Sequence, residues 1–208
     1  MLLARYTGQD DIVVGTVISG RRHSDLDNII GFFANMTAIR NKPSEDKTFS
    51  QFLNEVKQKF LGAYENQDAQ FDELVHKLGI PRQSGRHPLV ETGMTVQSEN
   101  IQGTELKKFS KYDIRIDPAP FQENITHFDL SLIATDHPES IKIYFEYSTA
   151  LFKSATIEAM SKHLLQIIQQ VVENLEIPLK DITFSHGLMA AASDTHEDDD
   201  DDWTFDDE

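Results

Sequence analysis

The hydrophobic pattern of the first forty residues predicts the end of a helix followed by two strands. Apolar residues at helical spacing in residues 2–6 stop at Gly8, which is typical of the last turn of a helix. The β-branched run DIVVGTVIS at residues 11–19, bounded by Gly20, predicts a fully buried strand. A second strand is expected around Ile39.

At Thr48 the pattern changes from that of a strand to that of a helix. Thr48 or Ser50 caps this helix, and a shorter helix is expected at residues 71–78, ended by Gly79. The helix that begins near Thr48 is amphipathic because its apolar residues recur at intervals of three and four positions. They are Phe49, Phe52, Leu53, Val56, Phe60, Leu61 and Tyr64.

Strand patterns return beyond Pro88. The strands are expected at residues 90–97, 109–116, 128–134 and 141–147. The segment TDHPES at residues 135–140 is expected to form the hairpin loop between the last two strands.

One long helix closes the predicted fold. It runs from Ser154 to Leu175 and stops before Pro178. Strands and helices in this order predict an α/β fold with a mixed β-sheet flanked by helices. The expected apolar face of the long helix consists of Ile157, Met160, Leu164, Ile167, Ile168, Val171, Val172 and Leu175.

Negative charge is concentrated at the carboxyl end of the chain. Residues 186–208 carry ten acidic side chains and no Lys or Arg, and removing those ten from the net charge of −16 leaves −6 for the rest. A body of this charge without a stripe of Lys and Arg argues against a nucleic-acid partner. Like charges without an apolar period predict an acidic tail that is disordered in isolation.

The sequence contains no general motif for catalysis, metal binding or membrane insertion. Its eight His are scattered singly, it has no Cys, and it contains neither a phosphate-binding Gly-rich loop nor a nucleophile elbow. No metal or bound cofactor is therefore expected. No apolar stretch is long enough for a signal peptide or a membrane span, so we expect a cytoplasmic protein without a membrane partner.

Three segments resemble the core motifs of the condensation domains of nonribosomal peptide synthetases. Residues 30–40, IGFFANMTAIR, are similar to IGxFVNTxxxR; residues 65–74, ENQDAQFDEL, to HQDYPFExL; and residues 82–89, RQSGRHPL, to RDxSRNPL. The resemblance covers about residues 1–184. The departures include Ala34 for Val, Met36 for Thr, Gln70 for Pro and His87 for Asn.

The resemblance implies a fold of two chloramphenicol-acetyltransferase-like lobes that enclose a reaction tunnel. The acyl donor and the acceptor amine would arrive on the 4′-phosphopantetheine arms of carrier proteins. The family motif HHxxxDG, whose second His positions or deprotonates the attacking amine, is absent from this sequence. Residues 1–184 are thus expected to form the C-terminal lobe alone, with no catalytic residue and with the N-terminal lobe as a partner.

The resemblance also implies that this lobe contributes to the tunnel wall. The candidate residues are Ser19, Gly20, Arg21, Asn35, Thr37 and Gln97. Other interpretations stay open: Gly20 and Gly31 could be turn glycines that need an unusual φ, and Asn35 could hydrogen-bond the backbone at a turn.

A second group of motif residues is expected to hold the structure together. Arg40 and Arg86 are expected to pair with acids such as Asp68, because Arg suits such ion pairs. Asp129 could reach the other lobe or form a salt bridge within this one. The whole group is Gly31, Arg40, Gln67, Asp68, Arg82, Arg86, Pro88 and Asp129.

Residues 185–208 resemble the short linear docking segments found at the ends of synthetase subunits. Trp203 and Phe205 lie beside a run of acids that includes Asp200, Asp201 and Asp202. The resemblance implies that the segment adds as a strand to a basic β-hairpin docking domain on another subunit, with the acids raising the association rate. A solvated, disordered end is the alternative interpretation.

Two functions follow from these observations. The first is half of an amide-forming condensation domain, and the second is a non-catalytic module that presents the acidic tail to a partner subunit. The related activities of epimerisation and heterocyclisation are less favoured, because residues 30–40 are closer to the condensing pattern.

Overall fold

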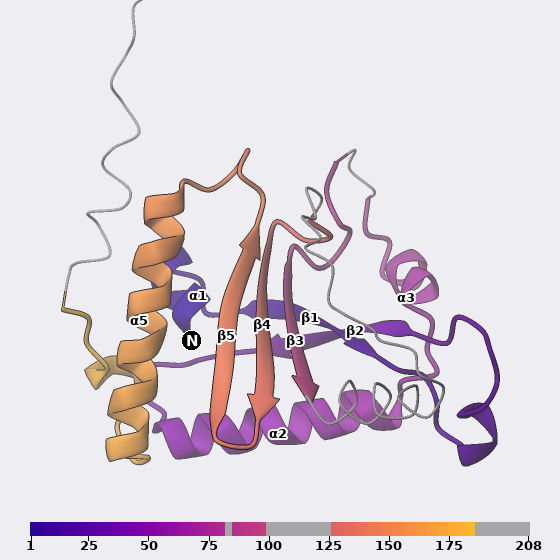
Figure 1. Ribbon diagram of the computed structural model, residues 1–208. Helices are drawn as coiled ribbons and strands as arrows, with labels where there is room; N and C mark the ends of the chain where they lie inside the picture. Colours follow the sequence, from indigo (N-terminus) through magenta and orange to yellow (C-terminus); the bar gives the residue numbers. More distant parts are fainter. Residues whose placement is uncertain (82–84, 99–125, 186–208) are drawn as a thin grey trace, which may run out of the picture.

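The computed structural model describes residues 1–81, 85–98 and 126–185, which form one five-stranded sheet with helices packed on it (Figure 1). The strand order is β2-β1-β3-β4-β5. The pairs β1/β2 and β4/β5 are antiparallel, whereas β1/β3 and β3/β4 are parallel, so the expected mixed sheet is confirmed. The strands are β1 (Ile12–Ile18), β2 (Asn35–Asn41), β3 (Thr92–Ser98), β4 (Leu130–His137) and β5 (Ser140–Tyr147).

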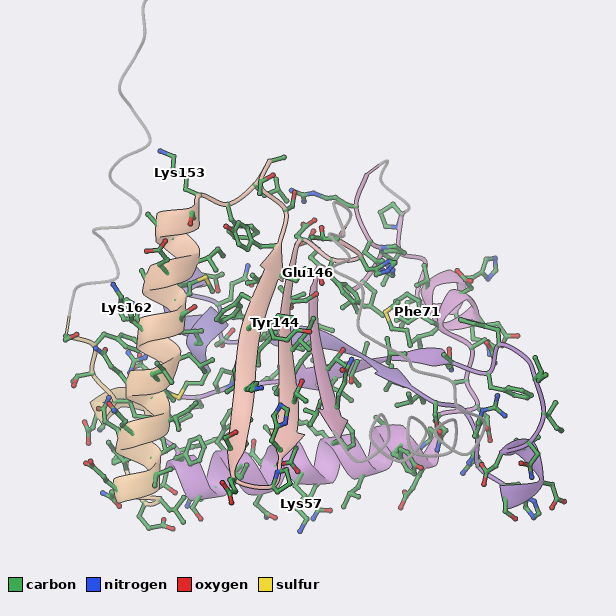
Figure 2. The ribbon with its side chains drawn as sticks, viewed as in Figure 1. Lys57, Phe71, Tyr144, Glu146, Lys153 and Lys162 are labelled. Atoms are coloured by element: carbon green, nitrogen blue, oxygen red, sulfur yellow. The ribbon has the colours of Figure 1, made fainter. Side chains whose placement is uncertain are left out.

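Four α-helices surround this sheet in the part of the chain that the structure describes. The long helix α5 stands beside β5, α2 passes across the ends of β3 and β4, and α3 lies at the opposite side from α5 (Figure 1). Lys153 and Lys162 point from α5 away from the sheet (Figure 2). The helices are α1 (Leu2–Thr7), α2 (Phe49–Glu65), α3 (Phe71–Lys77) and α5 (Ser154–Glu173).

The sequence signals for helix ends are confirmed. Gly8 follows α1 with φ 66°, and Gly79 lies two residues after α3 with φ 64°. Thr48 caps α2 through a capping box: its hydroxyl accepts a hydrogen bond from the Gln51 amide, and the Gln51 side chain accepts one from the Thr48 amide.

The main core lies between α1, α2, α5 and one face of the sheet. The short 3₁₀ turn Leu179–Asp181 closes one end of this layer, and the isolated bridge between Thr48 and Pro178 ties it to the start of α2. The buried side chains of this core are Phe52, Leu130, Ile157, Met160, Ile167, Val171, Leu179 and Ile182.

A smaller core covers the other face of the sheet beside α3. Phe71, Val75 and Val90 are buried there, with Phe128 packed against them. Gly93 makes room for this cluster, because a Cβ at that position would lie 2.5 Å from the Phe128 ring.

Two expectations for the strands are corrected. The first strand is not fully buried, since Val17 is 52% exposed. Val17 lies on the same face of the sheet as the smaller core but beyond the part that α3 covers. The hairpin loop at residues 135–140 is shorter than expected: His137 still pairs with Ser140, so only two residues turn between β4 and β5. The strand expected at 109–116 lies outside the described residues.

The expected apolar face of α5 is wider than the face that is buried. Val172 is 74% exposed because it follows Val171 by one position, which turns it about 100° away from the sheet. Leu175 lies beyond the last helical residue and is also exposed.

The carboxyl-terminal half of α2 is likewise less buried than its pattern suggests. Only the first turns, with Phe49, Phe52 and Val56, pack against the core. Leu53, which follows the buried Phe52, is exposed, and further along the helix Phe60, Leu61 and Tyr64 are exposed as well.

His163 is buried on α5, although its sequence context indicated no particular role. Its Nδ1 is 2.7 Å from the Tyr6 hydroxyl, and its ring centroid is 4.6 Å from that of Phe184. It therefore joins α1 and the chain after α5 to the core.

None of the described helices is long and apolar enough to span a membrane.

Candidate functional site

The three sequence motifs meet at one pocket of about 520 Å³. The motifs lie at residues 30–40, 65–74 and 82–89, and each contributes side chains to the wall. Their convergence makes this pocket the candidate functional site. The lining residues are Phe32, Ala34, Asn35, Met36, Gln70, Phe71, Asp72, Arg86, His87 and Pro88.

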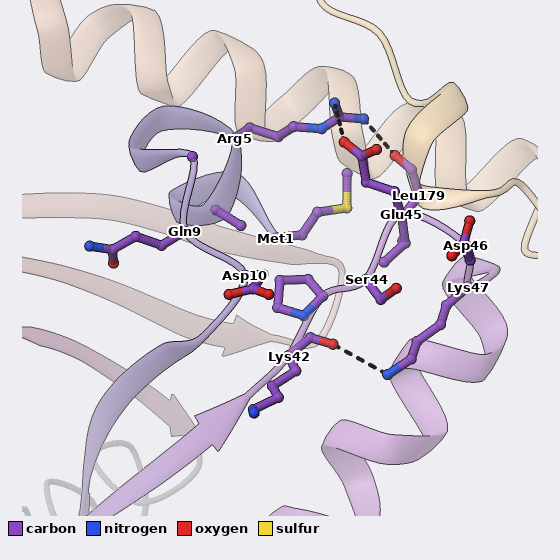
Figure 3. Close-up of a pocket in the computed structure, with 13 residues that line it drawn as sticks. Met1, Arg5, Gln9, Asp10, Lys42, Ser44, Glu45, Asp46, Lys47 and Leu179 are labelled. Carbon is purple, nitrogen blue, oxygen red and sulfur yellow. Dashed lines mark hydrogen bonds and ion pairs between the residues drawn. The ribbon is translucent and has the colours of Figure 1, made fainter.

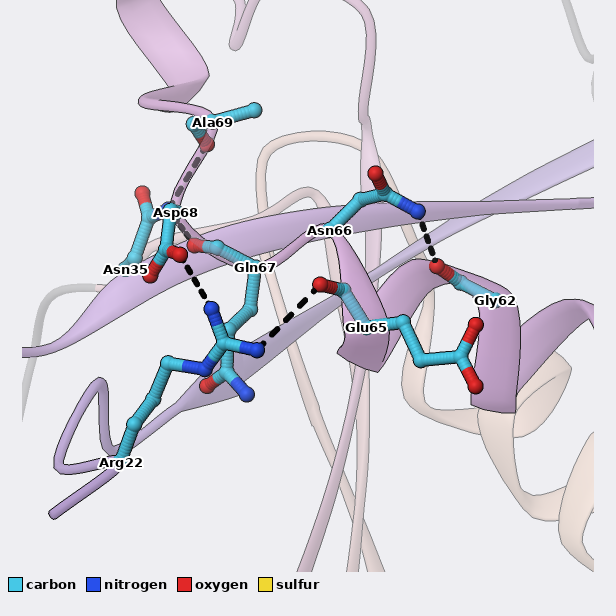
Figure 4. Close-up of polar contacts among 8 residues, drawn as sticks. All are labelled: Arg22, Asn35, Gly62, Glu65, Asn66, Gln67, Asp68 and Ala69. Atoms are coloured by element: carbon cyan, nitrogen blue, oxygen red, sulfur yellow. Dashed lines mark hydrogen bonds and ion pairs between the residues drawn. The ribbon is translucent and has the colours of Figure 1, made fainter.

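Asn35, the first residue of β2, joins the first two motifs. Its Nδ2 donates hydrogen bonds to the carbonyl oxygens of Gln67 and Ala69, both at 2.9 Å (Figure 4). Its Oδ1 accepts from the backbone amides of Met36 and Phe71 at 3.0 and 3.4 Å. The backbone interpretation of Asn35 is thus confirmed, while its side chain also lines the pocket.

Asp68 strengthens the same turn, next to the buried side chain of Gln67. Arg22 donates to the carboxylate of Asp68 and to the carbonyl oxygen of Glu65, so the segment before β2 is attached to the end of α2 (Figure 4). Gln67 is only 5% exposed, and its Nε2 has no hydrogen-bond partner among the described residues.

Arg21 organises the loop between β1 and β2. Its guanidinium donates to the carbonyl oxygens of Leu26, Ile29 and Gly31 and lies 4.3 Å from the centroid of the Phe33 ring. This is a cation–π contact that adds to the hydrogen bonds. Arg21 therefore fixes the shape of the loop that precedes Asn35.

Gly20 begins this loop and can only be glycine. Its φ is 65°, and a Cβ at this position would lie 1.9 Å from the carbonyl oxygen of Phe33. Ser19 accepts a hydrogen bond from the Arg21 amide. Gly31 does not have a positive φ, so that explanation for it is wrong.

His87 lies in a row of three rings at the pocket. Its centroid is 5.7 Å from that of Phe71 and 5.4 Å from that of Phe128. His87 received no function from its sequence context, although it stands where the family motif has Asn. That departure was the signal that could have identified it.

The expected ion pairs of the motif arginines form, but with other partners than Asp68. Arg40 donates to both oxygens of Asp11, at 2.8, 3.0 and 2.5 Å, and Arg86 pairs with Glu91 at 3.3 Å. The reason is position in the sheet. Arg40 pairs with Val13 near one end of β2, close to Asp11, whereas Asp68 lies in the turn bonded to Asn35 at the other end of that strand.

Of the remaining candidates, Thr37, Gln97 and Asp129 do not line the pocket. Thr37 pairs with Thr16 inside the sheet, and Gln97 is exposed near the end of β3. The backbone of Asp129 bridges Glu91 and Ser148. Pro88 lines the pocket, whereas Arg82 lies outside the described residues.

A second polar pocket, of about 690 Å³, lies between α1 and the loop before α2 (Figure 3). Its cations are already engaged: Arg5 donates to the carbonyl oxygen of Leu179 at 2.7 Å and pairs with Glu45, and Lys47 donates to the carbonyl oxygen of Lys42. These bonds hold the loop and the 3₁₀ turn. No cluster of metal-ligating side chains occurs in the described part of the chain.

The chain belongs to the condensation domain family, whose family model matches residues 1–187. It is 46% identical over 181 residues to bacitracin synthase 3 of Bacillus licheniformis, which covers 87% of this chain and 3% of that synthase. It is 42% identical over 184 residues to gramicidin S synthase 2 of Brevibacillus brevis, covering 88% of this chain and 4% of the relative. The sequence resemblance is thereby confirmed.

Solved structures of related domains have the same fold. A four-domain nonribosomal peptide synthetase bound to AMP and glycine matches with a TM-score of 0.76 and 21% identity, over 89% of this chain and 15% of that one. The first condensation domain of the calcium-dependent antibiotic synthetase matches with a TM-score of 0.63 and 17% identity, over 88% of this chain and 38% of that one. The chain therefore spans a small part of the synthetases and well under half of that solved condensation domain.

Replacing Asn35 should destabilise the lobe. In Asn35→Ala, two carbonyl oxygens and two amides lose their partner, so we expect the free energy of unfolding to fall by about 2 kcal/mol. Urea unfolding measures the loss. Asn66→Ala is the matched control in the same turn, because its side chain bonds only to Gly62 within α2. Equal losses in the two variants would contradict the role assigned to Asn35.

The Asp11–Arg40 pair should make stability depend on pH. The hydrogen bond from Arg40 holds the pKa of Asp11 below its usual value. Its contribution is therefore present above the unfolded pKa of about 3.9 and is lost as pH falls through the lower folded pKa. The stability difference between the protein and Asp11→Asn should be constant above about pH 5 and shrink below about pH 4. A difference that does not change across this range argues against the pair.

Proposed function

We propose that this chain forms the C-terminal half of a nonribosomal peptide synthetase condensation domain. Its role would be to supply one wall of the tunnel in which a carrier-bound acyl thioester is joined to an amine. The observation that carries the proposal is coverage, since the lobe matches a solved condensation domain over 88% of its own length but only 38% of the other chain. The motif HHxxxDG is also absent from this sequence.

An exposed apolar loop supports the proposal that a second lobe packs against this one. Ile30 and Phe32 are 102% and 92% exposed, and Phe32 also lines the pocket where the motifs meet. Arg21 holds the backbone on both sides of Ile30 through the carbonyl oxygens of Ile29 and Gly31. Large apolar side chains presented to solvent by a fixed loop are typical of an interaction surface.

The reaction assigns different roles to the two lobes. The amine attacks the thioester carbonyl, the C–N bond forms, the C–S bond breaks, and the donor carrier leaves as its thiol. The His of the N-terminal lobe would position the amine or take its proton, and that proton finally reaches the departing thiolate sulfur. Both substrates would enter on 4′-phosphopantetheine arms, so this chain would shape the tunnel around them without binding a cofactor of its own.

The loop can be tested by calorimetry with the N-terminal lobe of a related condensation domain that carries HHxxxDG. Ile30→Ser combined with Phe32→Ser should weaken binding by about tenfold or more, because burial of two large apolar side chains is lost. Leu165→Ser combined with Val172→Ser is the control, since both residues are exposed on α5. Amide formation between carrier-bound substrates should appear only when both lobes are present.

Absence of binding by the unchanged chain would overturn this part of the proposal. An equal effect of the two double variants would show that exposed apolar area, and not the loop, determines association.

The acidic tail suggests a second function, as a docking segment for another synthetase subunit. Its composition favours this role, because Trp203 and Phe205 lie within a run of acids where a merely solvated end needs no aromatic residues. The partner would be a basic β-hairpin domain that accepts the segment as an added strand.

The tail hypothesis makes its own prediction. Replacing Trp203 and Phe205 by Ala should lower the affinity for such a docking domain at least about tenfold, and binding of the unchanged chain should weaken as salt is added. Leu188→Ala with Met189→Ala provides the control from the same segment. Unchanged affinity in the aromatic variant would refute docking without affecting the condensation-domain proposal.

A further inference from the structure

The main core of the lobe borders a third cavity, separate from the two pockets described above. It has a volume of about 310 Å³ and lies between the sheet and the helices α1, α2 and α5. Residues from all five strands form its floor, and residues of α1, α2 and α5 form its roof. Val14, Phe52, Val56, Leu132, Phe145 and Ile167 are among the side chains that line it.

The lining of this cavity is almost entirely apolar. No Asp, Glu, Lys, Arg or His is among the lining residues, and the hydroxyl of Thr92 is used in a hydrogen bond to the carbonyl oxygen of Val13. The remaining side-chain polar group is the amide of Asn41, whose Oδ1 is buried without a partner in the described structure. A water molecule needs two to four polar partners, so this space is poorly suited to hold water.

Its size and its chemistry together define a ligand class. Engineered core cavities of about 150 Å³ with a similar lining stay dry and bind benzene or xenon. The present cavity is about twice as large. Charged ligands are disfavoured, because a charge would lose its hydration without gaining a strong counter-ion. The one ionisable group of the lining residues is the α-amino group of Met1, and burial lowers its pKa to about 6, so it is mostly uncharged at neutral pH.

We propose that this cavity is a binding site for an uncharged, apolar small molecule of the size of a substituted benzene ring. Met94 is 41% exposed, which makes β3 the side from which the ligand enters. The cavity shares no lining residue with the pocket where the three motifs meet, and it lies against the face of the sheet that carries α2 and α5. The site is therefore distinct from the proposed tunnel wall and does not rest on it.

The test uses the whole chain with toluene as the probe and benzoate as its charged analogue. Toluene should bind saturably, shift the methyl NMR signals of Val14, Leu132 and Ile167, and raise the melting temperature by about 5 °C or more at a hundredfold excess over its dissociation constant. Benzoate should produce none of these three effects.

Two filling variants make the result specific. Leu132→Phe places a ring in the cavity, so it should abolish the toluene-induced shift and raise the melting temperature of the free protein. Val56→Leu is a smaller change, for use if Leu132→Phe does not fold, and should weaken toluene binding several-fold. Leu165→Phe, which adds a ring to the exposed side of α5, should leave binding unchanged.

Several outcomes would overturn the proposal. One is the absence of saturable toluene binding. Another is equal binding of benzoate, which would indicate surface association. A third is a filling variant that still binds toluene, which would place the bound toluene outside this cavity. A fourth is a Leu132→Phe variant that lowers the melting temperature of the free protein, which would mean that the core is closed in solution.

Discussion

Two carbonyl oxygens of the turn between α2 and α3, those of Gln67 and Ala69, need hydrogen-bond donors, and the side-chain amide of Asn35 supplies both. One amide side chain satisfies two carbonyl oxygens and two amides at this junction. Since an unpaired buried polar group is costly, the position of α3 depends on this residue. The candidate pocket depends on it in turn, because α3 forms one of its walls.

The loop before Asn35 is fixed just as firmly, yet Ile30 and Phe32 in this loop are exposed to solvent. Arg21 binds three carbonyl oxygens and the Phe33 ring, and Gly20 allows a backbone approach that no other residue permits. Such restraint would be needless for a loop that only connects two strands. It is understandable if Ile30 and Phe32 must meet a second surface in a defined position.

Element types were predictable from the sequence because they depend on local patterns. The capping box at Thr48 and the Gly signals after α1 and α3 act within a few residues, so those ends were placed correctly. Burial depends instead on what lies opposite. The exposure of Val17 and Val172 could not be derived, because it depends on which part of each face is covered. The partner of Arg40 was missed for the same reason, since strand pairing brings Asp11 near it.

The two faces of the sheet place different demands on the sequence. Beside α3, Gly93 leaves space that the Phe128 ring fills. That ring packs against His87, which in turn packs against Phe71 at the pocket. Side chains alternate between the faces of a strand, so a substitution on one face need not disturb the other. The motif pocket and the apolar cavity can therefore vary independently, although the same strands support both.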